Sequence, residues 1–253
     1  MFSRLFSRSA APPAPVSAHM PAGSRIYAIG DMHGRLDLVE RLRTVIVEDA
    51  RRHPIERKVV VYLGDYVDRG PDSRGVIDLL ARETLPGFES VFLKGNHEDS
   101  MLQFLVDPGV APAWMNYGGD ATLYSYGVRP PDVRKIDELL AAQTAFIEAL
   151  PPEHLEFLRA LKLVHIEGDY AFVHAGFREG VPIEFQTPED MMWIRNEFLS
   201  SAADFGKIAV HGHTITDHPE IRPNRIGIDT GAFATGTLTC LVLEGAERRF
   251  LAT

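Results

Sequence analysis

Residues 58–70 read KVVVYLGDYVDRG: an apolar run, then a glycine, then a group of charged side chains. The run at 58–64 is short and rich in β-branched residues, which predicts a buried strand. Runs of the same kind at 25–30 and 90–95 predict two more strands. Amphipathic segments at 36–52 and 73–83 predict a helix between successive strands. This alternation predicts a βαβαβ core with a mostly parallel sheet.

The rest of the chain predicts a second layer of strands. Residues 98–160 are predicted to be helical, with interruptions at prolines and at the Gly118-Gly119 pair. After them, one helix is predicted near 188–199, and strands are predicted at 162–166, 170–173, 207–210, 225–228, 238–243 and 248–251. We therefore predict an α/β fold, a four-layer α/β/β/α sandwich of two mixed sheets flanked by helices.

The N-terminal residues differ in composition from the remainder. Residues 11–24 are rich in proline, alanine and serine and cannot build a core, and Arg4 and Arg8 interrupt the apolar residues before them. We predict a disordered leader over 1–24 and a single domain over 25–253, with a helical insertion at about 98–160.

The composition limits where the chain works and what it binds. A formal net charge of −9, with no stripe of lysine or arginine, argues against nucleic acid as a partner. No apolar run approaches about 18 residues, so no stable membrane association is expected. The single cysteine, Cys240, excludes an intramolecular disulfide and favours a reducing, cytoplasmic location. Because Cys240 lies in an apolar run, we expect a buried hydrophobe rather than a nucleophile.

Polar side chains follow five of the predicted strands, at the point where each strand ends. In chain order they form the segments Asp31-Met-His33, Asp65-Tyr-Val-Asp68-Arg69, Asn96-His97-Glu98, His174 and His211-Gly-His213. Ligands of α/β sheets bind beyond the carboxyl ends of the strands, so these side chains should converge. Any one segment alone is more often a turn or a hydrogen-bonded polar group, but all five together favour a metal site. Carboxylates, imidazoles and an amide, without a thiolate, favour Mn²⁺, Fe²⁺ or Zn²⁺.

The segments GDMHG (30–34), GDYVDRG (64–70) and GNHE (95–98), with two later histidines, resemble the phosphoprotein phosphatase family of metallophosphoesterases over residues 25–243. The segment from Trp114 to Leu123 and the late Gly-His-Thr are most similar to serine/threonine phosphatases of bacteria and phages. The resemblance implies the calcineurin-like fold and two divalent metal ions, with Mn²⁺ expected and Fe or Zn as alternatives. Asp31 and His33 are implied to bind the first metal and Asp65 to bridge the two, while the ligands of the second metal are Asn96, His174 and His213.

The resemblance also implies which residues act on the substrate. His97, positioned by Asp68, is the implied general acid. Arg69 and Arg195 are implied to hold the phosphate oxygens, and Asn96 lies where it can contact the substrate as well as a metal. His213 is preferred to His211 as a ligand because the family ligand lies in a Gly-His pair.

Elementary chemistry supports these implied roles. Two cations about 3.5–4 Å apart can share one carboxylate, and Asp65 follows a central strand. Water between two such ions has a pKa lowered towards neutrality, so hydroxide is supplied for in-line attack on phosphorus. The leaving alkoxide is a strong base, which an imidazolium such as His97 beside Asp68 can protonate. Arg69 adds bidentate contacts to the equatorial oxygens.

Two enzymatic functions share all of these residues. The first hypothesis is hydrolysis of phosphomonoesters, with phosphoserine and phosphothreonine proteins as substrates and small phosphoesters as the broader class. The alternative is hydrolysis of dinucleoside polyphosphates, as in the symmetrical diadenosine tetraphosphate hydrolases of the same family. Aromatic residues of the insertion either stack a nucleobase or form the core of a lid: Trp114, Tyr117, Tyr124 and Tyr126. A protein that binds phosphate without turnover is disfavoured because no ligand is missing.

Overall fold

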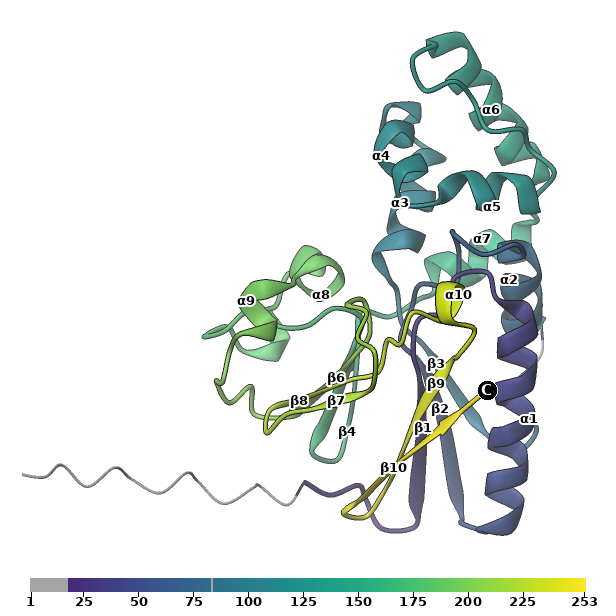
Figure 1. Cartoon of the computed structure of the whole chain (residues 1–253). Helices are drawn as coiled ribbons and strands as arrows, with labels where there is room; N and C mark the ends of the chain where they lie inside the picture. Colours follow the sequence, from purple (N-terminus) through teal and green to yellow (C-terminus); the bar gives the residue numbers. More distant parts are fainter. Residues whose placement is uncertain (1–17, 83) are drawn as a thin grey trace, which may run out of the picture.

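In the computed structural model of the chain, residues 18–82 and 84–253 are described. Two five-stranded sheets stack face to face, and helices cover both outer faces (Figure 1). The predicted four-layer sandwich of two mixed sheets is therefore confirmed.

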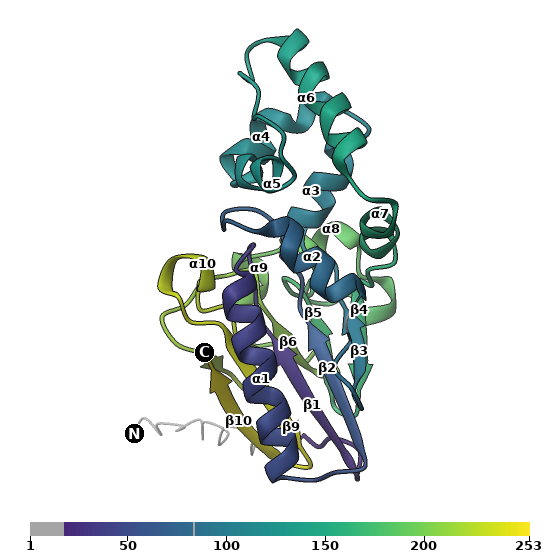
Figure 2. The ribbon, with the colours of Figure 1, turned by 90° about the vertical axis from the view of Figure 1, so that its right-hand side faces the viewer.

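The first sheet has the strand order β10-β9-β1-β2-β3. Its strands are β1 (Ser24–Ile29), β2 (Arg57–Tyr62), β3 (Glu89–Phe92), β9 (Thr239–Glu244) and β10 (Glu247–Ala252). The strands β1, β2 and β3 run parallel, as the βαβαβ pattern predicted, while β9 and β10 are antiparallel additions. The outer face of this sheet is covered by α1 (Leu36–Arg52) and α2 (Ser73–Arg82), as Figure 2 shows for α1 in particular.

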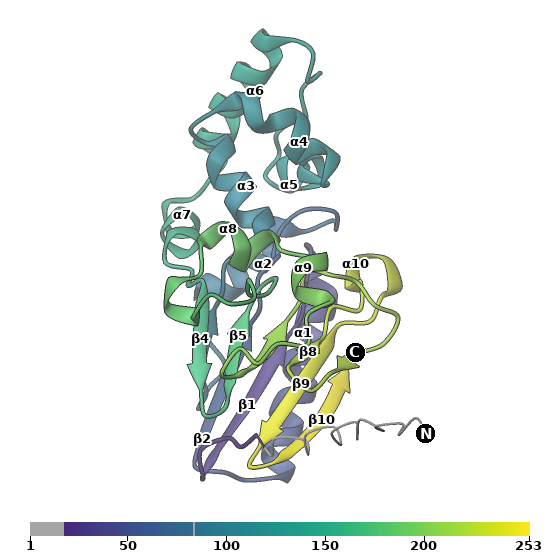
Figure 3. The same cartoon turned by 90° about the vertical axis from the view of Figure 1, so that its left-hand side faces the viewer.

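The second sheet has the order β4-β5-β6-β8-β7, with parallel pairing inside and antiparallel pairing at both edges. Its strands are β4 (Val164–Glu167), β5 (Tyr170–Val173), β6 (Ile208–His211), β7 (Glu220–Ile221) and β8 (Arg225–Gly227). Its outer side is covered by η2 (Ile183–Phe185), α8 (Pro188–Trp193) and α9 (Asn196–Leu199). Figure 3 shows α8 and α9.

The alternation of side chains along β1 explains the layers. Ile26 and Ala28 point between the sheets and join a core with residues of the second sheet, such as Phe172. Tyr27 and Ile29 point the other way and join the core under α1. Because both faces of the strand are buried, its sequence is apolar throughout rather than alternating.

The predicted helical insertion stands beyond the ends of the sheets (Figure 2). It is built from α3 (Asn96–Phe104), η1 (Pro108–Val110), α4 (Ala111–Asn116), α5 (Gly119–Ser125), α6 (Ile136–Ala149) and α7 (Pro152–Arg159). The helix α3 starts almost directly after β3, so its first turn lies at the edge of the first sheet. Trp114 and Tyr126 are buried in the insertion, whereas Tyr124 is exposed.

Three details differ from the sequence predictions. The predicted leader over 1–24 extends too far, because Ala18 and Met20 are buried between the sheets and the Met20 N–H donates to Gly245 O (2.8 Å). The folded region therefore begins by residue 18. Residues 1–17 of the predicted leader lie outside the described part of the chain. The helix predicted near 188–199 is two helices, broken at Ile194, whose ψ of 141° is extended. The short elements β7 and α10 (Ala232–Thr235) were not predicted.

Two expectations from composition can be compared with the described residues. Among residues 18–82 and 84–253, no helix combines the length and the apolar character that a membrane crossing requires. Cys240 is fully buried in β9, and burial raises the pKa of its thiol, as expected for a packing residue.

Candidate metal centre

The carboxyl ends of β1, β2 and β3 in the first sheet and of β5 and β6 in the second meet at one end of the sandwich. The structure brings all six predicted metal ligands together there, each at most 5% exposed: Asp31, His33, Asp65, Asn96, His174 and His213.

Asp65 lies between two groups of candidate ligands. Its Oδ2 is 3.5 Å from His33 Nε2 and 3.8 Å from His97 Nε2. Its Oδ1 is 3.4 Å from His174 Nε2, on the side where His213 also lies. One carboxylate with imidazole nitrogens on both sides is the arrangement that two cations share. The sequence placed His97 beside the leaving group, and in the structure its Nε2 also faces Asp65.

The tautomer of His174 follows from its partners. Its Nδ1–H donates to the carbonyl of Leu63 (2.9 Å), so its Nε2 carries a lone pair. That lone pair faces Asn96 Oδ1 at 3.0 Å and His213 Nδ1 at 3.2 Å. The imidazole of His33 is fixed in the same way, since its Nδ1–H donates to Val67 O (2.9 Å). Several acceptor atoms thus converge, as they do around a bound cation.

Asp31 closes the cluster from the end of β1. Its Oδ2 accepts the N–H of His213 (2.9 Å), while Asp31 Oδ1 and His213 Nε2 are buried atoms without a hydrogen-bond partner. Burial, and then the charges of Asp229 and Asp65, raise the pKa of Asp31. Orphaned acceptors and crowded carboxylates are unfavourable in a dry site unless cations compensate them. These residues therefore fit a pair of divalent ions.

The protonation states also suit metal binding. Burial lowers the pKa of His33 to about 3 and that of His213 to about 2, so both rings are neutral near neutral pH. Burial by itself would raise the pKa of Asp65, but the surrounding histidines, His174 first, hold it below its ordinary value. Neutral imidazoles and an ionised carboxylate are the forms that bind metal.

His97 and Asp68 form a buried pair beside this cluster. The Nδ1–H of His97 donates to Asp68 Oδ2 at 2.6 Å, and Asp68 is fully buried. Arg69 lies over the pair: its guanidinium nitrogens are 3.0 Å from His33 Nε2 and 3.2 Å from His97 Nε2. Its positively charged group also lies 4.8 Å from the ring of Phe233, a residue of α10 for which the sequence predicted no role.

Arg195 approaches the cluster from the other side. Its Nη1 donates to His213 O (3.2 Å) and Thr214 Oγ1 (3.2 Å), because the break between α8 and α9 turns this residue towards β6. His211 does not belong to the cluster, since its ring packs on Phe198 at 5.0 Å. Arg69 and Arg195 therefore flank the candidate metal ligands at opposite ends.

The backbone of the centre is strained. Five non-glycine residues have a positive φ, between 43° and 72°, and all five were predicted site residues: His33, Asp65, Asp68, Arg69 and His213. Residues outside glycine adopt this left-handed conformation at an energetic cost, and such positions cluster at functional sites. Close approach also explains two glycines, because a Cβ on Gly64 would lie 2.6 Å from Gly95 N, and one on Gly95 would lie 2.1 Å from Asp65 Oδ1.

Glu98 organises the loop after β2, although the sequence suggested no role for it. Its Oε2 accepts the N–H groups of Asp65 and Gly95 (2.9 Å each), and its Oε1 accepts those of Tyr66 (2.7 Å) and Val67 (3.3 Å). Burial, and then the charge of Asp65, raise the pKa of Glu98 to about 8. The four N–H donors favour its ionised form, and divalent ions beside Asp65 would remove the opposing charge.

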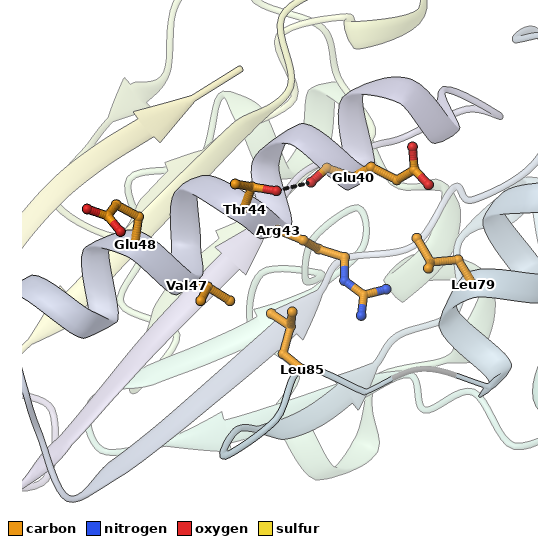
Figure 4. A pocket seen from close by; sticks show the side chains of 7 residues that line it. All are labelled: Glu40, Arg43, Thr44, Val47, Glu48, Leu79 and Leu85. Atoms are coloured by element: carbon orange, nitrogen blue, oxygen red, sulfur yellow. Dashed lines mark hydrogen bonds between the residues drawn. The ribbon is translucent and has the colours of Figure 1, made fainter.

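The hollow drawn in Figure 4 is a different feature. It has a volume of about 440 Å³ and lies against α1, on the outer side of the first sheet. Its lining residues include Arg43, Leu79 and Leu85, and none of them is a predicted site residue. The hollow and the candidate metal centre therefore lie in different parts of the molecule.

The sandwich gathers carboxylates, imidazoles and one amide at the joined ends of its two sheets, an arrangement suited to phosphoester hydrolysis with two metal ions. The chain belongs to the calcineurin-like phosphoesterase family, whose model matches residues 24–233.

Two curated relatives point to different substrates. The asymmetrical bis(5'-nucleosyl)-tetraphosphatase PrpE of Bacillus thuringiensis (strain Al Hakam) is 28% identical over 228 residues, covering 84% of this chain and 88% of that protein. Serine/threonine-protein phosphatase 2 of Escherichia coli (strain K12) is 26% identical over 232 residues, covering 85% and 90%. Both names describe hydrolysis of a phosphorus–oxygen bond, in a dinucleoside tetraphosphate for the first relative and in a phosphoprotein for the second.

Solved structures share the fold. A structure provisionally assigned as a diadenosine tetraphosphatase superposes with a TM-score of 0.59 at 21% identity, covering 94% of both chains. The cold-active protein-tyrosine phosphatase of a psychrophilic Shewanella species superposes with a TM-score of 0.53 at 15% identity, covering 98% of this chain and 89% of that one.

Proposed function

We propose that the protein hydrolyses phosphomonoesters with two divalent metal ions, and that phosphoserine and phosphothreonine side chains of proteins are its substrates. The observation that carries hydrolysis of phosphomonoesters is the buried His97–Asp68 pair, joined at 2.6 Å and facing Asp65. The choice of phosphoproteins as substrates is supported by the similarity to serine/threonine-protein phosphatase 2. An alkoxide such as the one that leaves from phosphoserine is a strong base and needs a proton during cleavage. A polyphosphate leaving group is far less basic and gains much less from a general acid.

The proposed roles follow the geometry. When bound, the two ions supply Lewis-acid activation of the phosphoryl group and of the attacking water. The residues that would hold the ions are Asp31, His33, Asp65, Asn96, His174 and His213. Arg69 holds phosphate oxygens from the His33 side and Arg195 from the His213 side, where both guanidiniums already point. His97 protonates the leaving oxygen, and Asp68 stabilises the charged imidazole.

The second candidate is asymmetrical cleavage of dinucleoside tetraphosphates, favoured by the 28% identity to PrpE. The symmetrical cleavage considered from sequence has less support, since the PrpE relatives are asymmetrical enzymes. Two aromatic side chains lie at the centre and could stack a nucleobase: Tyr117, 6.1 Å from the His97 ring, and Trp193, 6.4 Å from the His213 ring. Of the insertion aromatics, only Tyr117 is both exposed and next to the centre.

We also propose Mn²⁺ as the native ion, a cytoplasmic location, phosphoproteins or small phosphoesters as partners, and one catalytic domain that includes the helical insertion. The donor set without thiolates supports the choice of ion. The single, buried cysteine supports the reducing compartment.

Parallel assays test the substrate class. Purified protein loaded with Mn²⁺ is given phosphoserine, phosphothreonine and phosphotyrosine peptides, p-nitrophenyl phosphate and diadenosine tetraphosphate, and kcat/KM is measured for each. We expect the phosphoserine and phosphothreonine peptides to exceed diadenosine tetraphosphate. A higher kcat/KM for diadenosine tetraphosphate, with ATP and AMP as products, would instead establish the second candidate.

The variant His97→Asn tests the proton donor. We expect it to retain two metal ions and to lose activity on phosphoserine peptides much more than on p-nitrophenyl phosphate, because a nitrophenolate leaves without protonation. Metal content is measured by plasma mass spectrometry on the same samples. Equal losses on both substrates would contradict the role of general acid, and the loss of one ion would assign His97 to the metal ligands instead.

A further inference from the structure

Two side chains of the helical insertion bind the carboxylate of Asp68. The indole Nε1–H of Trp114, in α4, donates to Asp68 Oδ2 at 2.9 Å. The hydroxyl of Thr122, in α5, donates to Asp68 Oδ1 at 2.6 Å and accepts the Asp68 N–H at 2.9 Å. Together with His97 on Oδ2, these donors occupy both carboxylate oxygens.

Burial raises the energetic cost of losing any of these hydrogen bonds to Asp68. Asp68 and Thr122 are 0% exposed and Trp114 is 1% exposed, so water does not replace a lost partner. A hydrogen bond to a charged group contributes about 1.5–3 kcal/mol, more than a neutral one. Because Trp114 and His97 share Oδ2, the indole fixes the rotation of the carboxylate about its Cβ–Cγ bond. A carboxylate free to rotate would no longer hold His97 in one orientation.

The packing of Trp114 does not require this bond. Its ring lies 5.0 Å from Phe104 and 6.0 Å from Phe146, contacts that a phenylalanine could also make. The indole N–H is nevertheless directed at the one carboxylate that orients the proton donor. The Thr122 Oγ1 lies 3.0 Å from Ser73 Oγ, and Ser73 Oγ also accepts the Asp68 N–H. Asp68 is therefore held by residues of both α2 and α5.

We propose that Trp114 and Thr122 are positioning residues for catalysis: they hold Asp68 so that His97 points at the leaving oxygen, and the insertion is thereby part of the acid machinery. The proposal rests on the proposed function of His97. Neither residue contacts the substrate, and each acts through Asp68 alone.

The kinetic test is a double-mutant cycle in the full chain. Trp114→Phe and the nearly isosteric Thr122→Val should each lower kcat on a phosphoserine peptide by about tenfold or more, leave KM nearly unchanged and affect p-nitrophenyl phosphate less. In the His97→Asn background neither substitution should lower the rate further, because the group on which it acts is gone. Tyr126→Phe is the matched control. Tyr126 is a buried aromatic residue of the same insertion, and its hydroxyl pairs with His154 at 2.9 Å. The Tyr126→Phe variant should keep the wild-type rate.

A second readout does not depend on any substrate. The sequence has two tryptophans, so the indole region of a nitrogen–proton NMR spectrum has two signals, and Trp114→Phe identifies the signal of Trp114. Asp68→Asn should shift the Trp114 signal upfield and leave the Trp193 signal in place, because an amide oxygen is a weaker acceptor than a carboxylate.

The outcomes separate the two proposals. An unmoved Trp114 signal in Asp68→Asn, or equal rate losses with and without His97, would overturn the positioning role. Wild-type protein that hydrolyses no phosphomonoester would overturn the proposed function, and the NMR comparison would then decide alone whether Trp114 binds Asp68. Should Trp114→Phe fail to fold, Thr122→Val carries the same kinetic prediction.

Discussion

Replacing Glu98 by glutamine changes one oxygen of a buried side chain into an NH₂ group. Four backbone N–H groups point at this side chain, two at each carboxylate oxygen. The single amide oxygen of the introduced glutamine can accept the pair from Tyr66 and Val67 or the pair from Asp65 and Gly95, but not both. Two buried donors are therefore left facing another donor.

The magnitude follows from those two donors. A buried donor without an acceptor costs about 1–3 kcal/mol, so the free energy of unfolding should fall by about 2–6 kcal/mol. For a chain of this size, 1 kcal/mol corresponds to about 2–4 °C in the unfolding midpoint, which gives a decrease of about 4–24 °C. Metal affinity should fall as well, because either orientation of the glutamine frees two of the four N–H groups that hold the backbone around Asp65.

Thermal unfolding in excess chelator at about pH 9, above the raised pKa of Glu98 so that its carboxylate is ionised, measures the first effect without the contribution of bound metal. Asp99→Asn is the matched control. Asp99 is the next residue in the same helix, is partly exposed and pairs with Lys94 at 2.5 Å. Its substitution should lower the free energy of unfolding by less than about 1 kcal/mol. If Glu98→Gln and Asp99→Asn lowered the midpoint equally, Glu98 would not organise the loop as described.

Three further results are expected. Asp65→Asn should reduce the content of both metal ions at once, since Asp65 is shared by both ligand groups, and full stoichiometry in that variant would contradict the bridging role. Arg69→Ala should lower kcat by about 10²-fold with metal content intact, as expected for the loss of one preorganised donor; an unchanged rate would assign the phosphate clamp to Arg195. Cys240 should resist alkylation in the native protein and react only on unfolding, because burial raises its pKa, and rapid native labelling with iodoacetamide would refute this.

Residues that follow an apolar strand were accessible from sequence. Asp31, Asp65, Asn96 and His174 each come within a few positions of a strand end, and parallel strands bring such ends together without further information. The periodicity of the apolar residues was sufficient for both the elements and the four layers. It missed the short elements β7 and α10, continued one helix through the break at Ile194 and extended the leader past residue 17.

The hydrogen-bond partners of the site residues could not be predicted from the sequence. Trp114 meets Asp68 across 46 positions of sequence, and no local pattern encodes a pairing between an insertion helix and a strand-end loop. The break that directs Arg195 towards His213 falls in a segment without glycine or proline, so the helical pattern continued through it. Glu98 lies in the recognised segment 95–98, but its role could not be predicted. Its four hydrogen-bond partners are backbone N–H groups, which nearly every residue has and which leave no signal in the sequence.

The left-handed backbone at five site residues has a consequence for protein engineering. Each such residue costs about 1–2 kcal/mol relative to an ordinary conformation, and the sum is comparable to the whole stability of about 5–15 kcal/mol of a typical domain. Glycine or asparagine at Arg69, where φ is 67°, would relieve one of these costs while removing the side chain proposed to hold phosphate oxygens. A selection for thermostability alone would therefore enrich inactive variants at these positions, and any library built to stabilise this enzyme should hold all five fixed.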